Sequence, residues 1–183
     1  MFNHLTIEEL ESGLAVIRES PKDSGILEKL VIRPLEDRRR TLSDAEVSPE
    51  GGVHGDAWAN GCWKSLPDGR PDPDVQFTIM NTRAIRLMAQ SESRWSLAGD
   101  QFFADLDLSR DNLPCGQRLS VGSAELRITD VPHNACAKFT ERFGADAVKF
   151  ANSEAGKKLR LRGVYATVIQ AGVVRVGDRL KKL

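Results

Sequence analysis

The sequence predicts a mainly β fold, a closed or nearly closed β-barrel with a few short helices at its ends. The second half of the chain alternates short apolar runs with tight turns, and Gly122-Ser123 links two runs of alternating hydrophobicity. Such a two-residue link is a strong hairpin signal. Nearer the C-terminus, Ala171-Gly172 and Gly177-Asp178 separate three further runs. Many short strands joined by turns are typical of barrels whose ends are plugged by helices.

The composition is that of an ordinary globular chain, which we expect to form one domain over residues 1–183. Charged residues make up 28% of the 183 residues and hydrophobic residues 40%, and 26 basic residues balance 26 acidic ones. The zero net charge argues against a nucleic-acid-binding protein, which would carry a basic excess. No apolar run approaches the ~20 residues that a membrane span needs. We therefore expect neither nucleic acid nor a membrane as a partner, and no oligomeric state is predicted.

The N-terminus and the cysteines both predict a cytoplasmic protein. Acidic residues follow the N-terminus where a signal peptide would have a basic region and then an apolar stretch. Cys62, Cys115 and Cys136 are odd in number and scattered, so they form neither a disulfide framework nor the close pair of a zinc site. This usage fits a reducing compartment.

The N-terminal third predicts a helix and two strands. Thr6 and Glu9 match a capping box, so a short helix to about Ser12 is expected. Apolar runs at 14–17 and 26–33 predict two strands joined by a turn.

A polar region follows. Asp37-Arg38-Arg39-Arg40 is a charge run, for which a solvated loop is the first interpretation and anion binding the second. Residues 48–74 are rich in Gly, Pro and Asp, and so long a loop is usually functional or disordered. The other expected elements are a helix from Asn81 or Thr82 to about Gln90, helical turns at 145–151, and strands at 75–80, 102–108, 119–121, 124–128, 164–169, 173–176 and 179–180.

The segment that carries the candidate chemistry is Pro132-His133-Asn134-Ala135-Cys136-Ala137-Lys138-Phe139. Asn134 is a good N-cap residue, so we expect a helix over 135–143 with Cys136 in its first turn. Free amides at a helix start, with His133 and Lys138 alongside, favour a thiolate with a lowered pKa. A thiolate suits a soft metal or sulfur transfer. The alternative is a small, buried and inert cysteine.

Several motifs in order resemble the MOSC domain family, named after the C-terminal domain of molybdenum-cofactor sulfurases. The resemblance covers roughly residues 14–181 and is strongest over 48–181. It rests on Gly52-Val53-His54-Gly55-Asp56, Gly99-Asp100-Gln101, the hairpin at 116–128, the Cys136 segment, Arg162-Gly163-Val164-Tyr165-Ala166 and the turn region at 172–178.

The resemblance implies a small β-barrel in which Cys136 is the functional cysteine. In some members this thiolate ligates the molybdenum of a bound molybdopterin, and in others it is proposed to carry sulfur as a persulfide. Arg162 is the first candidate for the cofactor's phosphate, because a guanidinium binds phosphate through two hydrogen bonds; a surface salt bridge is the alternative. The other candidate cofactor-binding residues are His54 and Asp56, which could equally serve a Gly-rich turn, Asp100, Lys138, His133 and Asn134.

Three functions follow from this interpretation. The first is a molybdenum-cofactor protein with Cys136 as metal ligand, which supports redox chemistry such as the reduction of N-hydroxylated compounds with electrons from a donor protein. The second is a sulfur carrier that forms a persulfide on Cys136; the chain has no evident pyridoxal-binding lysine motif, so a partner cysteine desulfurase would supply the sulfur. The third is a binding module without chemistry, suggested by Asp105 and Ala135, which stand where many members have Asn and Pro.

Overall fold

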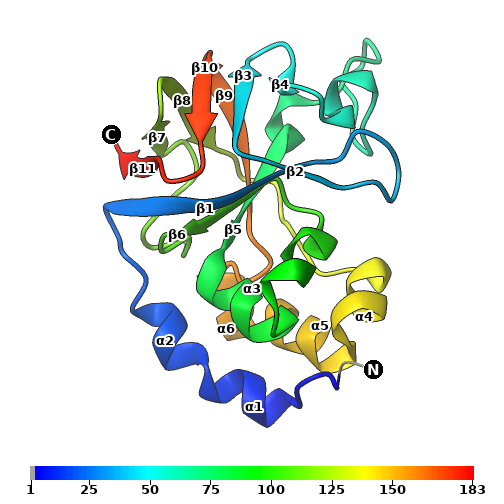
Figure 1. The fold of residues 1–183 in the computed structure, drawn as a ribbon, viewed down its shortest axis with the longest axis vertical. Helices are drawn as coiled ribbons and strands as arrows, with labels where there is room; N and C mark the ends of the chain where they lie inside the picture. Colours follow the sequence, from blue (N-terminus) through cyan, green and yellow to red (C-terminus); the bar gives the residue numbers. More distant parts are fainter. Residues whose placement is uncertain (1–2) are drawn as a thin grey trace.

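Seven strands close into a mixed β-barrel, and most of the helices lie together on one side of it (Figure 1). The computed structural model describes residues 3–183. Strands follow one another around the ring in the order β11, β7, β8, β9, β5, β6 and β1, and pairing of β1 with β11 closes it. β5 and β6 run parallel, whereas the other barrel pairs are antiparallel. The strands are β1 (Ser24–Ile32), β5 (Phe77–Asn81), β6 (Phe102–Asp105), β7 (Arg118–Val121), β8 (Ala124–Ile128), β9 (Val164–Gln170) and β11 (Arg179–Lys182).

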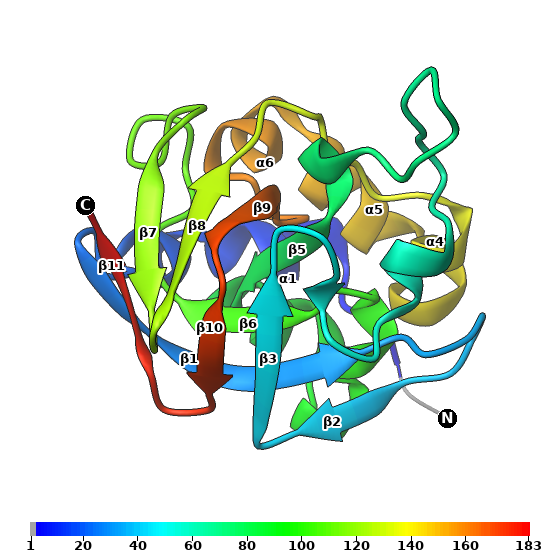
Figure 2. The same ribbon diagram turned by 90° about the horizontal axis from the view of Figure 1, so that it is seen from above.

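A smaller sheet and one edge strand flank the barrel. β2 (Arg40–Leu42) pairs with β1, and the chain then enters a three-stranded sheet in the order β10, β3, β4. Figure 2 shows β10 and β3 side by side in front of the barrel. The bounds of this sheet are β3 (Asp44–Ser48), β4 (Gly52–Val53) and β10 (Gly172–Arg175).

The helices are short. Within residues 3–183, every helix has too few residues and too little apolar character to cross a lipid bilayer. The helices are α1 (Ile7–Ser12), α2 (Leu14–Arg18), α3 (Thr82–Ala89), α4 (Ala137–Phe143), α5 (Ala145–Asn152) and α6 (Glu154–Leu159), with 3₁₀ turns η1 (Ala57–Asn60), η2 (Pro73–Val75) and η3 (Glu92–Ala98).

Two apolar cores hold these layers together, and adjacent residues of one strand serve different cores. In β6, Phe102 points into the barrel while Phe103 packs outside it against the helices. Ile79 and Met80 of β5 divide in the same way. Side chains alternate across a strand, so strands between a barrel interior and a helical layer are apolar on both faces.

Local signals placed several elements correctly. The Thr6 hydroxyl accepts from the Glu9 amide (3.3 Å) and the Glu9 carboxylate accepts from the Thr6 amide (2.8 Å), which confirms the capping box. Asn81 caps α3 by accepting from the Ala84 amide (2.9 Å). Gly122 has φ +55°, and a Cβ there would lie 2.2 Å from the backbone carbonyl oxygen of Val173 in β10, so the β7–β8 turn requires glycine.

Several predicted elements differ from the structure. Residues 14–17 form the helix α2 rather than a strand: Leu14 and Ile17, three residues apart, face the helical core, and Val16 is 56% exposed. β6 ends at Asp105, not at residue 108. The nearly unbroken apolar run at 164–169 suggests burial on both faces, but β9 is largely buried only as far as Val168, and Ile169 and Gln170 are exposed.

Candidate functional site

Cys136 occupies the N-cap of α4. Its backbone is extended (φ −120°, ψ −177°), and the helix begins at Ala137. The Cys136 carbonyl accepts from the amides of Phe139 (2.9 Å) and Thr140 (3.1 Å), while its thiol makes no capping hydrogen bond. The side chain is exposed. Cys136 is therefore not buried, as the alternative interpretation expected, and a thiol at this position is open to reagents and ligands.

The predicted helix start at Ala135, with Asn134 as its cap, was wrong. Asn152 of α5 binds both backbone groups of Ala135: its Oδ1 accepts from the Ala135 amide (3.0 Å) and its Nδ2 donates to the Ala135 carbonyl (3.1 Å). These tertiary contacts hold residue 135 outside the helix, so the cap moves to Cys136 and Asn134 stays on an exposed loop.

Arg162 and Asp100, both singled out from the sequence, form a buried ion pair. Arg162 Nη1 lies 2.6 Å from Asp100 Oδ2, and Nη2 donates to the Ala98 carbonyl (2.8 Å). The guanidinium also lies over the ring of Phe139, 5.0 Å from its centroid. The exposed fractions of the side chains are 9% for Arg162 and 0% for Asp100. Burial raises the pKa of Asp100, and the Arg162 charge opposes that shift without cancelling it.

His133 joins this pair from the loop before α4. Its Nδ1 lies 3.8 Å from Asp100 Oδ1, and its ring packs 4.6 Å from that of Tyr165. Burial, followed by the charges of Arg162 and Arg33, holds the pKa of His133 well below its usual value, so the ring is neutral at pH 7. Within residues 3–183, Asp100 Oδ1, His133 Nδ1 and Arg162 Nε are buried without hydrogen-bond partners. Three polar atoms of one cluster therefore keep unused hydrogen-bonding capacity.

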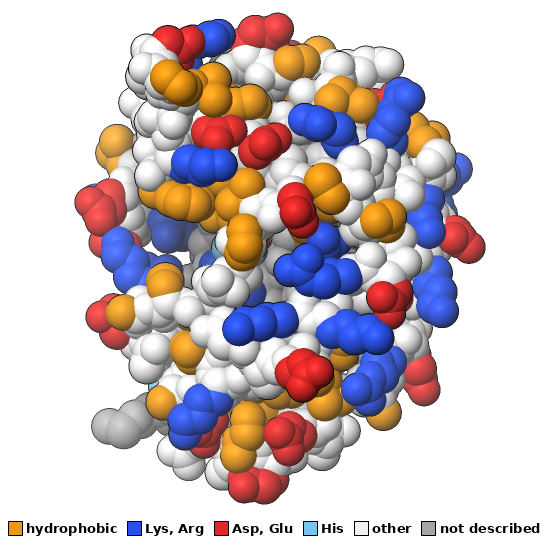
Figure 3. Space-filling view, turned by 180° about the vertical axis from the view of Figure 1, so that it is seen from behind, with side chains coloured by type: hydrophobic (Ala, Val, Ile, Leu, Met, Phe, Trp, Pro, Cys, Tyr) orange, Lys and Arg blue, Asp and Glu red, His pale blue; other side chains and the backbone are white. Residues whose placement is uncertain are grey.

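A pocket of about 280 Å³ opens beside this cluster. Its walls come from the loop at 129–134, from α6 and from the start of β9, and they include His133, Asn134 and Arg162. Basic side chains gather on this side of the molecule, which is hollowed near its centre (Figure 3). We call this cavity the α6 pocket. Besides Arg162, its charged lining residues are Arg110, Asp130, Lys157 and Arg160.

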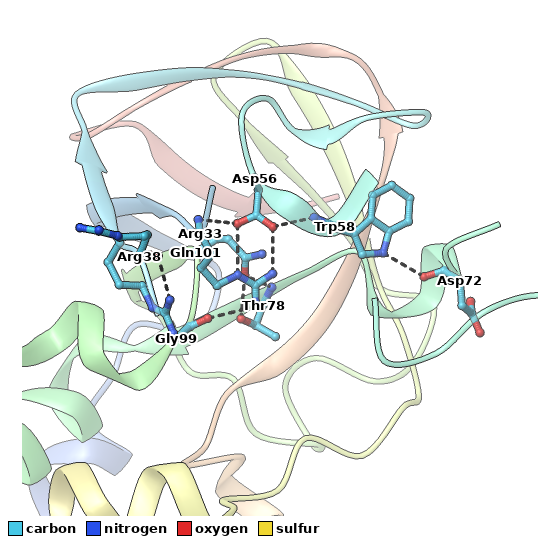
Figure 4. Close-up of polar contacts among 9 residues, drawn as sticks. Arg33, Arg38, Asp56, Trp58, Asp72, Thr78, Gly99 and Gln101 are labelled. Atoms are coloured by element: carbon cyan, nitrogen blue, oxygen red, sulfur yellow. Dashed lines mark hydrogen bonds and ion pairs between the residues drawn. The ribbon is translucent and has the colours of Figure 1, made fainter. Parts of the chain in front are cut away.

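Asp56 is engaged in a second ion pair, with Arg33 at the end of β1 (Figure 4). Its Oδ2 accepts from the Arg33 backbone amide (2.8 Å) and from Nε (3.1 Å), and its Oδ1 accepts from Nη2 (3.0 Å) and from the Trp58 amide (3.2 Å). Arg33 Nη1 continues to the Gly99 carbonyl (3.3 Å), next to Asp100. Both oxygens of Asp56 are thus used inside the protein, where they join the 52–56 turn to the Gly99-Asp100 turn.

Arg39, from the charge run, lies beside the same Gly99 turn, with its Nη2 3.8 Å from where a Cβ at Gly99 would stand. Its Nη1 donates to the Arg38 carbonyl (2.8 Å), and among the described residues its buried Nε has no partner. Burial lowers the pKa of Arg39, and the charges of Arg142 and Arg33 lower it further. The run is therefore not uniformly solvated: Arg39 is half-buried among other guanidinium groups, which favours the anion-binding interpretation at this residue.

Two predicted residues lie outside this arrangement. His54 is exposed and lines a separate groove of the small sheet, with Glu46 and Gly172. Lys138, on the outer face of α4, forms surface ion pairs with Glu36 (2.9 Å) and Asp37 (3.7 Å). Hydrogen bonding to Glu36 raises the pKa of Lys138.

Sequence reasoning missed several residues around the site. An aromatic residue in the polar 48–74 loop needs an apolar partner, for which the core is the first interpretation and a ligand ring the second. Trp58 is buried in the core, whereas Trp63 is 69% exposed and lies 6.4 Å, centroid to centroid, from Tyr165. Lys157 and Arg160 were visible only as part of a basic stretch. The aromatic residues in the 48–74 loop and that basic stretch were usable signals, but only the fold places them near His133.

The fold and the family follow from comparison with known proteins. The structure is similar to that of the YuaD protein from Bacillus subtilis, with a TM-score of 0.64 and 18% identity over 86% of this chain and 94% of that one. It also resembles YiiM from Geobacillus stearothermophilus, with a TM-score of 0.56 and 16% identity over 87% and 75% of the two chains. YiiM from Escherichia coli gives a TM-score of 0.54 and 16% identity over 86% and 69%. At these identities the likeness shows a shared fold.

No curated protein matches the sequence significantly. The family model of the MOSC domain matches residues 73–181, which is more than half of the chain. This match spans β5 to β11 and includes Asp100, Cys136 and Arg162. The chain therefore belongs to the MOSC domain family.

Proposed function

We propose that this protein binds an organic molybdenum cofactor of the molybdopterin type, with the Cys136 thiolate as the protein's ligand to the metal. The observation that carries the proposal is an exposed thiol that follows a cationic pocket in the same short segment. Asn134 lines that pocket, and chain geometry keeps the Cα atoms of Asn134 and Cys136 within about 7 Å of each other.

The residues present fit such a group. A thiolate is a suitable ligand for a soft metal centre. Residues 3–183 contain no group of three or more His, Cys, Asp or Glu side chains placed to hold a metal ion. Cys136 would therefore supply one ligand, and an organic cofactor would supply others. Arg162 keeps a buried, unpartnered Nε, and guanidinium groups suit the phosphate of a molybdopterin.

When bound, such a cofactor supplies oxo-transfer or electron-transfer chemistry, of which the reduction of N-hydroxylated compounds is our proposed example, with electrons from a donor protein. The chain's own contribution is placement. Asp100 and the Ala98 carbonyl hold the Arg162 guanidinium in one orientation. His133 stays neutral, so it adds a hydrogen-bonding nitrogen to the site without adding charge.

A persulfide carrier is the second candidate, and the exposure of Cys136 favours it. Sulfur transfer from a cysteine desulfurase needs a thiol that a partner protein can reach, and it requires no bound metal. In this case Cys136 would accept the sulfur and pass it on without a resident cofactor.

Metal analysis tests the first proposal. The protein is purified from a molybdate-supplied host as the parent chain, as Cys136→Ser, and as Cys115→Ser, which changes another exposed cysteine. We expect near-stoichiometric molybdenum and pterin in the parent and in Cys115→Ser, and loss of the metal in Cys136→Ser. Equal metal content in the two serine variants would remove Cys136 as the ligand.

Cyanolysis tests the second candidate. The same three proteins are incubated with a cysteine desulfurase and cysteine, desalted and treated with cyanide. Thiocyanate from the parent and from Cys115→Ser, but not from Cys136→Ser, supports the carrier. Absence of thiocyanate from the parent rejects it, and absence of both metal and thiocyanate would leave the binding module without chemistry.

A further inference from the structure

The α6 pocket has an excess of positive charge that the protein does not neutralise. Lys157 of α6 forms no ion pair with any residue in the described range 3–183. Its neighbour Lys158 pairs with Asp111 (3.1 Å) outside the pocket lining. At the rim, Arg110 lies 4.0 Å from Asp130, a pair in which both side chains are more than half exposed. Asp130 offsets the charge of Arg110, and the pair contributes little stability because it is exposed, so the positive charge left over at the rim is that of Lys157.

Arg160 adds a buried charge without a carboxylate partner in the described chain. Its Nη1 donates to the carbonyls of Leu108 (3.4 Å) and Leu113 (2.5 Å). Burial lowers the pKa of Arg160, and the charge of Arg110 lowers it further. Neutral carbonyls satisfy hydrogen bonds but not charge, so an anion in the pocket would stabilise a guanidinium group that is costly to bury.

His133 and Arg162 close the pocket on the side of Asp100. Their side chains are 10% and 9% exposed, and each has a buried nitrogen that lacks a partner among residues 3–183. Buried polar groups are normally hydrogen-bonded. Two side chains that line one cavity therefore carry polar atoms that the described chain leaves unsatisfied, so the inner wall of the pocket is polar as well as cationic.

The size of the pocket restricts what it holds. Its volume of about 280 Å³ lies just below the ~300–1,000 Å³ of typical small-molecule sites. It therefore suits a small ligand, or one end of a larger ligand whose remainder extends toward the adjoining Cys136 segment.

We infer that the α6 pocket binds the phosphate group of a small phosphate monoester. Lys157, Arg110 and Arg160 supply the countercharge, and Arg162 lies at the inner wall. This inference deepens the proposed function and rests on it only for the position of the ligand's other end near Cys136; the phosphate site stands on the pocket residues alone. The monoester is either the cofactor itself or a free phosphorylated metabolite.

Isothermal titration calorimetry with inorganic phosphate, and then with glycerol phosphate, tests the inference. The parent chain should bind both, and more weakly as sodium chloride is raised. Lys157→Ala should bind phosphate about tenfold more weakly, the loss expected for one hydrogen bond to a charged group. Lys158→Ala is the matched control, one residue along the same helix and outside the pocket lining, and its affinity should equal that of the parent.

Cys136→Ser separates this inference from the proposed function. Phosphate affinity should be unchanged in Cys136→Ser, whatever its metal content. Phosphate binding in a chain that takes up no molybdenum would assign the pocket to a free phosphorylated metabolite, whereas displacement of phosphate by bound molybdopterin would assign it to the cofactor. Absence of phosphate binding at millimolar concentration, or equal losses in Lys157→Ala and Lys158→Ala, would overturn the inference.

Discussion

Arg162→Met isolates the energetic role of the buried Arg162–Asp100 pair. Methionine keeps most of the length of the side chain and its contact with Phe139, but it removes the 2.6 Å ion pair and the hydrogen bond to Ala98. Asp100 is 0% exposed. The variant therefore leaves a fully buried carboxylate without its cationic partner.

Removal of one partner of a buried pair costs about 3–5 kcal/mol, because the remaining charge stays desolvated. Both side chains here are nine-tenths or more buried, so solvent cannot replace the lost guanidinium. Typical domains have a free energy of unfolding of about 5–15 kcal/mol. Arg162→Met should thus remove a large share of the stability of the chain.

The loss should also depend on pH, with a sign that the burial of Asp100 determines. Its folded-state pKa is raised, so the stability that its protonated form provides is present at low pH and is lost as pH rises through the folded pKa. Without Arg162 that pKa rises further, and the loss extends to higher pH. Urea denaturation at about pH 7.5 and about pH 5 should show a smaller difference between variant and parent at the lower pH.

Arg83→Met is the matched control. Arg83 pairs with Asp105 at 2.7 Å, but the two side chains are 21% and 25% exposed, so water can solvate the remaining carboxylate. The loss in free energy of unfolding should therefore be smaller for Arg83→Met than for Arg162→Met. A cost below about 1 kcal/mol for Arg162→Met, or a destabilisation that grows as pH falls, would refute the reasoning.

Two further predictions concern single positions. Gly163→Ala should lower the free energy of unfolding, measured by urea denaturation, more than Gly177→Ala does. Both glycines have a positive φ (+98° and +96°), but only at Gly163 does an added Cβ meet a backbone carbonyl, that of Ile79 at 2.6 Å. Equal losses of stability would contradict this clash. Trp63→Ala should change the free energy of unfolding by less than about 0.5 kcal/mol, because Trp63 is 69% exposed. Trp58→Ala should cost about 3–5 kcal/mol, because Trp58 is 6% exposed and donates to the Asp72 carbonyl. Similar losses in the two variants would contradict this packing.

Elements whose signals lie within a few residues were predictable. The capping box at Thr6 and the Asn81 cap each join residues three apart, and Gly122 has the positive φ (+55°) that a two-residue hairpin turn favours. Residues 14–17 failed because four apolar residues fit a strand and a helix equally well. Packing of Leu14 and Ile17 against the helical core decided the outcome.

The candidate site was predictable only in part. Cys136 and Arg162 stood out because their residue types carry chemistry and their neighbours match a family pattern. The position of Cys136 at the N-cap of α4 could not be predicted, because Asn152 fixes Ala135 from seventeen residues away. The sequence also could not predict that Lys157 lines the pocket while its neighbour Lys158 pairs with Asp111 outside the lining.

The sequence by itself determined the barrel class, the family resemblance and the cysteine on which the proposal rests, because alternating apolar runs, tight turns and motif order are properties of the chain. Only the tertiary structure decided that Asp56 is engaged by Arg33, that Asp100 lies against both Arg162 and His133, and that basic residues from separate segments share one pocket. Burial and countercharge depend on contacts between distant segments, and local sequence does not specify them.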